Sequence, residues 1–466
     1  MAKKKILLLA DDIRLHSGIG TMSKEFVLGT IDKYDWCQLA GAVNHPEKGK
    51  IIDMSQEIKQ QGGPADAYCK IYPTTGYGSP EEVRQMMQLE RPDAILHFTD
   101  PRFWGWLYNM EHEIRQHIPI MYYNIWDDLP YPHWNENAYE SCDLLMAISK
   151  QTYNINKHVC QRKPRTNWDL KYVQHGVDER KFFPVDENEE SFINFKKELY
   201  KNKEYDFVLF FNSRNIRRKG ISDLMMGFKE FLNTIPKEKA DKCALLLHTD
   251  PVDDNGTDLP AVASMLCPNT NIIFSNQKIP FQTLNLMYNS ADITCNPSSA
   301  EGFGISHMES MMAGKPTICS VIGGLQDQMG FKVDGRDITV DDFTEENGSN
   351  SKGRLSKEHG EWTYPLWTNM SLQGSPPTPY IYDSRPRIED ITKAIEYWYN
   401  TPKSERVTRG KVGREWAIKN KFTAKGMSDA MADAIAGCLK NWKPRERFTL
   451  IDTNKEKTIY PTGVLV

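Results

Sequence analysis

The chain has 466 residues, of which 39% are hydrophobic and 26% are charged, and these values are typical of a globular protein. Its formal net charge is −4, whereas proteins that bind nucleic acid typically carry an overall excess of positive charge. No apolar run approaches the roughly 20 residues needed to cross a bilayer, so we expect no stable membrane insertion. The nine cysteines are scattered without a CxxC pair, which favours reduced thiols and a cytoplasmic protein.

Short apolar runs alternate with helical stretches along most of the chain. The first series begins with a run at 4–10 and a helix at 21–30, and it continues with runs at 93–98, 118–125 and 144–148. The pattern then restarts, with runs at 207–212, 244–248, 271–274, 293–296 and 316–320. Alternation of this kind predicts parallel sheets covered by helices, so the predicted fold class is α/β with two successive units.

The boundary between the two units is predicted from charge. Asp, Glu and Lys crowd between the two series, at 184–205. The length of the chain allows two domains of about 200 residues each. We therefore assign residues 1–190 to the first domain and residues 191–400 to the second.

The C-terminal part of the second domain has a different composition. Residues 326–387 are rich in Gly, Ser, Pro and Asp, which indicates an insertion of loops with a short hairpin. Helical stretches follow at 388–399 and 405–442, and they are long enough to return across the first domain. We assign residues 401–466 to C-terminal helices and a tail that cross back in this way.

The strongest chemical signal is the segment Glu301-Gly-Phe-Gly-Ile-Ser-His-Met-Glu309, which follows a predicted strand. A strand-to-helix turn exposes N–H groups at a helix N-terminus, which suits an anionic diphosphate, and the glycines let the backbone approach the ligand. Glu309 lies farther along that helix, where it can reach ribose hydroxyls. Glu301, at the turn, can stabilise positive charge that develops on a donor sugar. The alternative interpretation is a capped helix with incidental acids.

Arg214 and Lys219 form a second constellation, because both follow the apolar run at 207–212. In open α/β sheets ligands bind at the carboxyl ends of the strands. Two cations at that edge would neutralise a diphosphate leaving group, which the protein itself must do in a site without metal. A basic surface loop is the alternative, and the combination with the Glu301 segment favours the diphosphate site.

Several segments share their spacing with one enzyme family. They are Ser17-Gly18-Ile-Gly20; His175-Gly-Val-Asp178 with Phe182 and Pro184; Arg214 with Lys219-Gly220; Tyr-Asn-Ser-Ala-Asp at 288–292; Pro297-Ser298; Glu301-Gly-Phe-Gly304 with Glu309; and Ala-Gly-Lys-Pro at 313–316. As a set they resemble the family-4 retaining glycosyltransferases of the GT-B fold, and they cover most of residues 1–325.

The resemblance implies two Rossmann-like domains that face each other across a cleft, and a retaining transfer from a nucleoside-diphosphate sugar, with UDP as the expected nucleotide. It implies no essential metal and no cofactor other than this donor substrate. Carried over by position, the catalytic residues are Arg214 and Lys219, at the diphosphate, and Glu301, at the sugar hydroxyls. The implied donor-binding residues are Gly18, Gly20 (in the phosphate-facing loop), Phe303, Gly304, Ile305 and Glu309 (at the ribose).

The acceptor side departs from the family pattern. The family has a His in the first domain after its fourth or fifth strand, whereas the corresponding segment here, 124–130, reads Asn-Ile-Trp-Asp-Asp-Leu-Pro. Asp127 or Asp128 takes the polar role in one interpretation, and His97 takes it in another. A purely structural role is the alternative for each of the three.

The acceptor itself is predicted from a second resemblance. Aromatic residues gather at 103–108 and at Trp126, Tyr131 and Trp134, and such rings stack on flipped bases or on sugars when they are not part of a core. As a whole, the chain resembles glycosyltransferases of tailed phages that modify hydroxymethylated cytosine in DNA. This resemblance implies double-stranded DNA as the acceptor and the host cytoplasm as the location. The alternatives are a bacterial glycan or lipid acceptor and, from another class, a non-catalytic nucleotide-sugar-binding protein.

Overall fold

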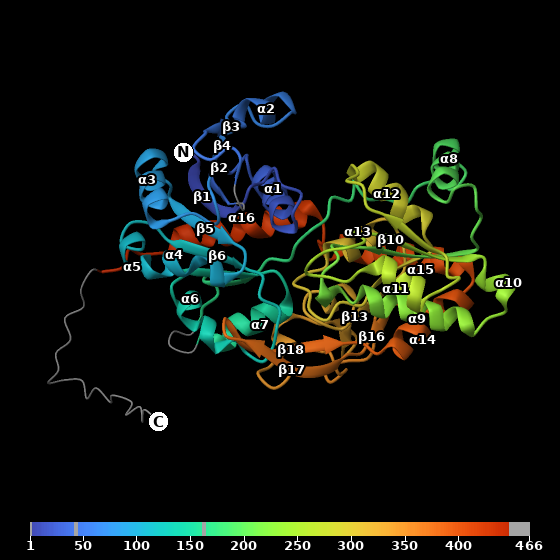
Figure 1. The fold of residues 1–466 in the computed structure, drawn as a ribbon. Helices are drawn as coiled ribbons and strands as arrows, with labels where there is room; N and C mark the ends of the chain where they lie inside the picture. Colours follow the sequence, from blue (N-terminus) through green and yellow to red (C-terminus); the bar gives the residue numbers. More distant parts are fainter. Residues whose placement is uncertain (1, 42–44, 161–164, 447–466) are drawn as a thin grey trace.

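The computed structural model describes residues 2–41, 45–160 and 165–446. The two predicted units are present as two helix-covered sheets that lie next to each other (Figure 1). The predicted tail after residue 446 lies outside the described residues. The predicted fold class, α/β with two Rossmann-like domains, is confirmed.

The first domain is built on an eight-stranded sheet in the order β3-β4-β2-β1-β5-β6-β7-β8, in which only β3 and β4 pair antiparallel. Its strands are β1 (Lys4–Asp11), β2 (Tyr34–Gly41), β3 (Ile52–Asp53), β4 (Cys69–Pro73), β5 (Ala94–Phe98), β6 (Ile120–Asn124), β7 (Leu144–Ala147) and β8 (Leu170–Tyr172). Its α-helices are α1 (Gly18–Gly29), α2 (Ser55–Gln60), α3 (Pro80–Glu90), α4 (Gly105–Asn109), α5 (Glu111–Ile114), α6 (Glu136–Glu140) and α7 (Lys150–Val159).

Strand β1 shows why the sheet is covered on both faces. Ile6 and Leu8 belong to a buried cluster with Phe26 of α1, whereas Leu7 belongs to a different cluster with Val83 of α3. Successive side chains of a strand point to opposite faces, so an uninterrupted apolar run needs a helix on each side. The loops that follow the carboxyl ends of the central strands carry polar residues such as Asp100, after β5, and Asp127, after β6.

The second domain is built on a six-stranded, all-parallel sheet in the order β11-β10-β9-β12-β13-β16. Its strands are β9 (Phe207–Asn212), β10 (Cys243–His248), β11 (Ile272–Ser275), β12 (Ile293–Asn296), β13 (Thr317–Ser320) and β16 (Thr363–Leu366). Its α-helices are α8 (Glu190–Leu199), α9 (Ile221–Asn233), α10 (Lys237–Ala240), α11 (Leu259–Leu266), α12 (Phe281–Ser290), α13 (Ile305–Met312), α14 (Ile388–Asn400) and α15 (Lys403–Lys419).

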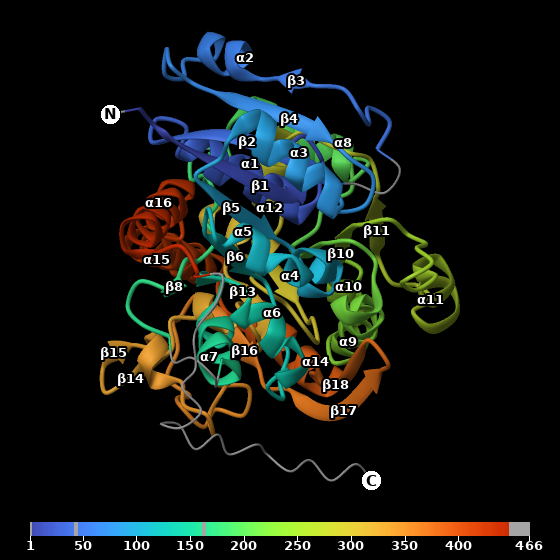
Figure 2. The ribbon, with the colours of Figure 1, turned by 90° about the vertical axis from the view of Figure 1, so that its left-hand side faces the viewer.

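The segment 326–387 is more ordered than its composition suggests, because it contributes β16 to the main sheet. It also holds the small ladder of β14 (Lys332–Val333) with β15 (Arg336–Asp337), and the longer hairpin of β17 (Asn369–Ser375) with β18 (Thr378–Arg385). This hairpin lies at the lower edge of the molecule in both ribbon views (Figure 2). It contacts the first domain, where the Tyr382 N–H donates to the Leu129 carbonyl at 2.7 Å.

The last helix, α16 (Ala424–Asn441), lies against α1 of the first domain. The Tyr34 hydroxyl donates to the Ala432 carbonyl at 3.0 Å, and a Cβ on Gly29 would lie only 2.0 Å from the Ser428 hydroxyl oxygen. The chain thus returns to the first domain after α15. Among the described residues, no helix is both long and apolar enough to span a membrane.

Candidate active site

A cleft of about 720 Å³ lies between the two domains, with both of them in its walls. The residues on the cleft surface are Ser17, Gly18, Ile19, Asp100, Arg102, Ile125, Trp126, Asp127, Asp128, Ile148 and His175 from the first domain, and Arg218, 300–305, 373–375, Thr378 and Ile381 from the second. Most of these residues follow the carboxyl ends of parallel strands, where α/β sheets bind ligands. We call Arg218 and 300–305, backed by Lys219, the α13 wall, and we call Asp100, Arg102, Trp126, Asp127, Asp128 and Thr378 the Arg102 wall.

The centre of the α13 wall is a buried carboxylate between two cations. The Lys219 ammonium contacts Glu301 Oε2, and the Arg218 guanidinium lies 3.3 Å from the same oxygen. The Ser298 hydroxyl donates to it as well, at 3.4 Å. Burial by itself would raise the pKa of Glu301, but the charges of Lys219 and Arg218 hold it below its ordinary value. Glu301 is therefore ionised at neutral pH.

Arg214 does not lie in the cleft, although the sequence pairs it with Lys219. Its guanidinium Nε donates to Asp253 Oδ2 at 2.9 Å, and its side chain is 63% exposed. The second cation beside Glu301 is Arg218 instead. Sequence reasoning missed this residue because position 214, and not 218, matches the family spacing.

The turn before α13 is shaped by glycine. Gly304 has φ of +89°, a conformation that L side chains rarely adopt, and a Cβ there would lie 2.4 Å from Leu325 Cδ2. Helix α13 begins at the next residue, Ile305, without a side-chain cap. Gly304 and Ile305 both lie on the cleft surface, so the free N–H groups of the first turn are available to an anionic ligand there.

The sequence predicts three further donor-binding residues near this turn, Phe303, Gly18 and Gly20. Phe303 lines the cleft, and its ring packs on His175 with 5.3 Å between centroids. Gly18 also lines it, and a Cβ on Gly18 would lie 3.7 Å from Ile305 Cδ1, so the first turns of α1 and α13 meet across the cleft. Gly20 is buried and is not part of the cleft surface. A Cβ there would lie 2.8 Å from the Asp12 carbonyl oxygen, so this glycine allows a tight turn.

Glu309 lies one turn after Ile305 on the same side of α13. The Tyr288 hydroxyl donates to Glu309 Oε2 at 2.7 Å and accepts from the Asn212 amide at 2.9 Å. Burial raises the pKa of Glu309 to about 7. This carboxylate is held in place by a chain of hydrogen bonds, and its charge depends on pH in the physiological range.

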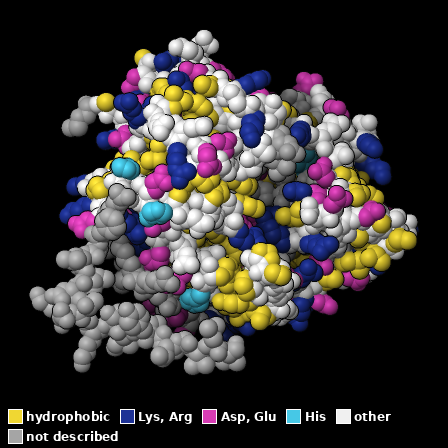
Figure 3. Space-filling model, turned by 60° about the vertical axis from the view of Figure 1, so that its left-hand side comes forward, with side chains coloured by type: hydrophobic (Ala, Val, Ile, Leu, Met, Phe, Trp, Pro, Cys, Tyr) yellow, Lys and Arg dark blue, Asp and Glu magenta, His cyan; other side chains and the backbone are white. Residues whose placement is uncertain are grey.

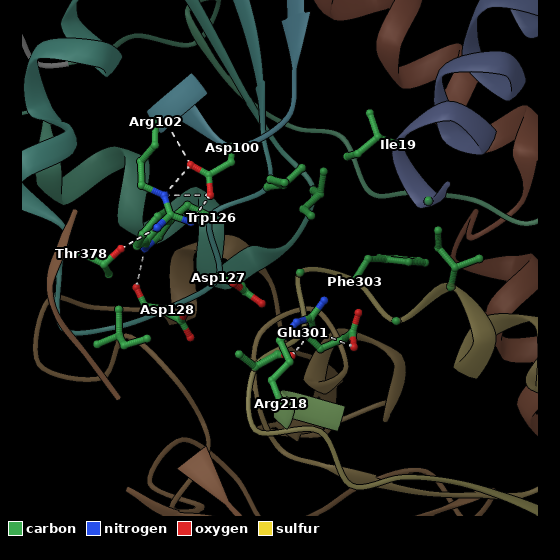
Figure 4. Close-up of a pocket in the computed structure, with 18 of the residues that line it drawn as sticks. Ile19, Asp100, Arg102, Trp126, Asp127, Asp128, Arg218, Glu301, Phe303 and Thr378 are labelled. Atoms are coloured by element: carbon green, nitrogen blue, oxygen red, sulfur yellow. Dashed lines mark hydrogen bonds and ion pairs between the residues drawn. The ribbon is translucent and has the colours of Figure 1, made fainter. Parts of the chain in front are cut away.

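The Arg102 wall is dominated by carboxylates, and Figure 4 shows Asp127 between the Arg102 group and the Arg218–Glu301 group. The Arg102 guanidinium binds both oxygens of Asp100, donates to the Thr378 hydroxyl at 2.7 Å and lies 5.7 Å from the Trp126 ring. Burial raises the pKa of Asp127 to about 6, although the charge of Arg218 opposes this. Burial, reinforced by Asp127, raises the pKa of Asp128 well above its ordinary value.

His97 is not a cleft residue, so the structure does not support it as an acceptor-side candidate. Its ring is fully buried on β5, stacked on Tyr122 at 4.2 Å between centroids, and its Nε2 lies 3.5 Å from Cys142 Sγ. Asp127 and Asp128, the other two candidates, do line the cleft. The histidine that reaches it is His175, whose Nδ1 lies 2.8 Å from the Tyr123 hydroxyl. Burial lowers the pKa of His175 to about 3, so it is neutral.

Comparisons with known proteins match part of the chain to a family and nearly all of it to a fold. Residues 191–341 match the family model described as glycosyl transferases group 1. A glycosyltransferase of Methanocaldococcus jannaschii, described as uncharacterized and named MJ1607, is 26% identical over 199 residues, which are 43% of this chain and 47% of that protein. The alignment thus spans about half the length of this relative.

The solved structures that are similar cover nearly the whole chain. HepE of Anabaena, in complex with UDP and glucose, has a TM-score of 0.62 at 14% identity and covers 93% of this chain and 99% of its own. Sucrose-phosphate synthase of Thermosynechococcus elongatus has a TM-score of 0.64 at 15% identity, with 93% and 98% covered. A glycosyltransferase of Rickettsia africae has a TM-score of 0.63 at 15% identity, with 95% and 100% covered.

The fold is therefore that of the GT-B glycosyltransferases, as the sequence predicts. Within it, the segment 191–341 carries the glycosyl transferases group 1 pattern, and this segment contains the whole α13 wall. None of these comparisons names a phage enzyme or a DNA acceptor.

Proposed function

We propose that the protein is a retaining glycosyltransferase of the family-4 type, which transfers a sugar from a UDP-linked donor bound in the cleft without an essential metal. The observation that carries the proposal is Glu301, an ionised carboxylate held by Lys219 and Arg218 beside the uncapped N-terminus of α13. Two cations, free N–H groups and the Glu301 carboxylate lie close together there. When the bond between the anomeric carbon and the diphosphate breaks, the cations and N–H groups can stabilise the negative diphosphate and the carboxylate can stabilise the positive sugar.

In this proposal the diphosphate lies against the first turn of α13. Its negative charge draws Lys219 and Arg218 partly away from Glu301, and both cations bind it more strongly as the glycosidic bond breaks. Glu301 accepts hydrogen bonds from the donor sugar and stabilises positive charge at the anomeric carbon. The Glu309 carboxylate, held by the Tyr288 hydroxyl, accepts hydrogen bonds from the ribose hydroxyls. The UDP named with the HepE structure supports this choice of nucleotide.

The charges of the Arg102 wall bear on the acceptor. Three Asp side chains (Asp100, Asp127 and Asp128) line this wall with one guanidinium, Arg102, which is already bound to Asp100. On the face shown in Figure 3, Lys and Arg side chains are interspersed with Asp and Glu. A DNA backbone needs clustered cations, so these features favour a neutral hydroxyl acceptor such as a glycan over modified cytosine in DNA.

Mass spectrometry tests both the activity and the acceptor. The protein is incubated with a panel of nucleotide sugars and with oligosaccharides, lipid acceptors or duplex DNA that contains hydroxymethylcytosine. We expect transfer from a UDP-sugar to an oligosaccharide, with the donor's anomeric configuration retained when the product is followed by NMR. Transfer to the DNA, with duplex binding that weakens steeply as salt rises, would restore the nucleobase acceptor. Donor binding without any turnover would identify a non-catalytic binding protein.

We also place this activity in the cytoplasm. All nine cysteines are free and buried, which supports a reducing compartment, where structural disulfides are rare. A cell-fractionation experiment with an antibody against the chain tests the location.

A further inference from the structure

A second cavity, of about 290 Å³, lies between the two domains and is distinct from the cleft. The first domain contributes Lys150, Tyr172 and Gln174, and the rest of the lining comes from residues 326–350 and from Trp416, Asn420 and Phe422. Phe422 packs against Phe303 of the cleft, with 6.1 Å between ring centroids. Phe422 lines the cavity and Phe303 lines the cleft, so these two rings separate the cavity from the cleft.

One side of the cavity is aromatic and fixed in position. The Trp416 ring is stacked on Phe422 at 5.5 Å with 25° between the ring planes, and Trp362 lies on it at 5.0 Å. The Trp416 indole N–H donates to Asp337 Oδ2 at 3.0 Å, which holds the ring in its orientation. Trp416 is only partly buried and lines the cavity together with Phe422, so this part of the lining is aromatic and rigid.

The lining also holds a carboxylate, Asp327, of which one oxygen makes no hydrogen bond among the described residues. Asp327 Oδ2 accepts from the Lys150 backbone N–H at 2.8 Å and from the Tyr172 hydroxyl at 3.1 Å. Asp327 Oδ1 has no hydrogen-bond partner among the described residues, and the Lys150 ammonium lies 3.7 Å away. The residue is only 4% exposed. Buried acceptors are normally paired, so this oxygen is available to a donor that enters the cavity.

These groups define the chemistry of a ligand. Two carboxylates (Asp327 and Asp337) outweigh one ammonium (Lys150), so the lining disfavours phosphates and nucleotides. A rigid aromatic lining suits the apolar C–H groups of a sugar ring, while hydroxyls of the sugar can donate to Asp327 and bind the amide of Asn420. We propose that this cavity is a second binding site, for a neutral mono- or disaccharide.

A sugar in this cavity would connect the two domains. Lys150 and Tyr172 belong to the first domain, whereas Asp327 and Trp416 belong to the second, so one ligand contacts both. Binding therefore favours the domain arrangement in which these residues converge. Sugar binding in this cavity requires no transfer reaction in the cleft, so it can be tested independently of the proposed function.

Direct binding to the full-length protein tests the site. The probes are glucose, galactose, N-acetylglucosamine and maltose, each titrated without nucleotide and followed by saturation-transfer NMR and tryptophan fluorescence. We expect saturable binding of at least one probe. Val340→Trp places a large side chain in the cavity and should abolish this binding, whereas Val252→Trp, on an exposed loop, should leave it unchanged. Asp327→Asn should weaken it at least tenfold, and circular dichroism verifies that each variant is folded.

A cleft variant separates the two sites. Glu301→Gln should leave the affinity for the neutral sugar unchanged, because Glu301 lies in the other cavity. If no probe binds saturably, or if the folded Val340→Trp and Asp327→Asn variants bind as the wild type does, the proposal is wrong. Loss of binding in Glu301→Gln alone would assign the sugar to the cleft and would equally overturn it.

Discussion

The two walls of the cleft are built in different ways. The α13 wall comes from two short segments of one domain: Arg218 and Lys219 follow β9, and the carboxylate and the glycine turn follow β12, with 82 residues between Lys219 and Glu301. The Arg102 wall is assembled from loops after two strands of the first domain together with Thr378, which lies 276 residues from Arg102. The groups that bind a common part of the ligand can thus stay within one domain. A surface formed by loops of both domains can then change without disturbing those groups. We therefore expect changes in the α13 wall to affect chemistry, and changes in the Arg102 wall to affect the acceptor.

The largest effect is expected for Lys219→Ala. In the proposed donor site the ammonium lies where the diphosphate gathers charge, so its loss should lower kcat by about 10²–10³, or about 3–4 kcal/mol. Arg214→Ala is the matched control, because its guanidinium is bound to Asp253 outside the cleft, and it should change kcat only a few-fold. Steady-state kinetics on folded variants measures both values. Equal losses in the two variants would show that Arg214 leaves Asp253 and enters the cleft when the donor binds.

A smaller effect, on donor affinity, is expected for Glu309. Its pKa is raised to about 7, so the carboxyl is protonated below that pH and loses its charge for the ribose hydroxyls. The donor KM should therefore rise as the pH falls through 7, while kcat changes less. Hydrogen bonds to a charged group contribute about 1.5–3 kcal/mol, so Glu309→Gln should raise the donor KM by about 10–100-fold.

The same variant also assigns the pH dependence. Asp127, with a pKa of about 6, titrates nearby and is the competing source. A pH profile of donor KM that becomes flat in Glu309→Gln assigns the dependence to Glu309. A profile that keeps its shape in this variant contradicts the ribose role.

The Arg102 wall should respond more weakly and on the acceptor side. Thr378→Val removes the hydroxyl that receives a hydrogen bond from Arg102 at 2.7 Å while it preserves the size of the side chain. A lost hydrogen bond of about 1 kcal/mol corresponds to an approximately fivefold rise in acceptor KM. Donor hydrolysis in the absence of acceptor should stay constant. An effect on donor KM that matches the effect on acceptor KM would mean that the hairpin supports the whole cleft.

No effect is expected from a metal chelator. The α13 wall provides two cations for the diphosphate, so activity should persist in EDTA. Loss of activity in EDTA that Mn²⁺ restores would show that these cations are insufficient, and it would contradict the proposed donor site at its centre.

The sequence predicted local features better than assembled ones. The runs that became β1, β9 and β10 are continuous and mostly apolar, since both faces of each strand are buried. Strand β2 was missed because polar side chains interrupt it. One of them is Gln38, which is only 2% exposed and bonds to the backbone of Asp11 and Ile13. Burial of that kind depends on tertiary partners that no local pattern shows.

The same distinction explains the candidate site residues. Glu301 and the turn at Gly304 follow from a strand-to-helix turn, and the structure has them in the cleft. The spacing of the family pattern selects Arg214 and not Arg218. Only the folded structure shows that the Arg218 guanidinium is the one that lies beside Glu301. His97 looked equally suitable as a polar group at a strand end, yet β5 is central and its residues are buried on both faces.

The chain passes from the first domain to the second after β8 (the outward crossing) and returns to the first domain after α15 (the return crossing). These two segments contact each other. Val177, on the outward crossing, donates its N–H to the Phe422 carbonyl at 3.0 Å, and its own carbonyl accepts from Ala424 on the return crossing at 3.2 Å. Gly176 leaves no room for a side chain, because a Cβ there would lie 2.0 Å from the Thr423 carbonyl oxygen. Two covalent connections joined at one point resist separation of the domains but permit rotation. We therefore expect any opening or closing of the cleft to be a rotation about this junction.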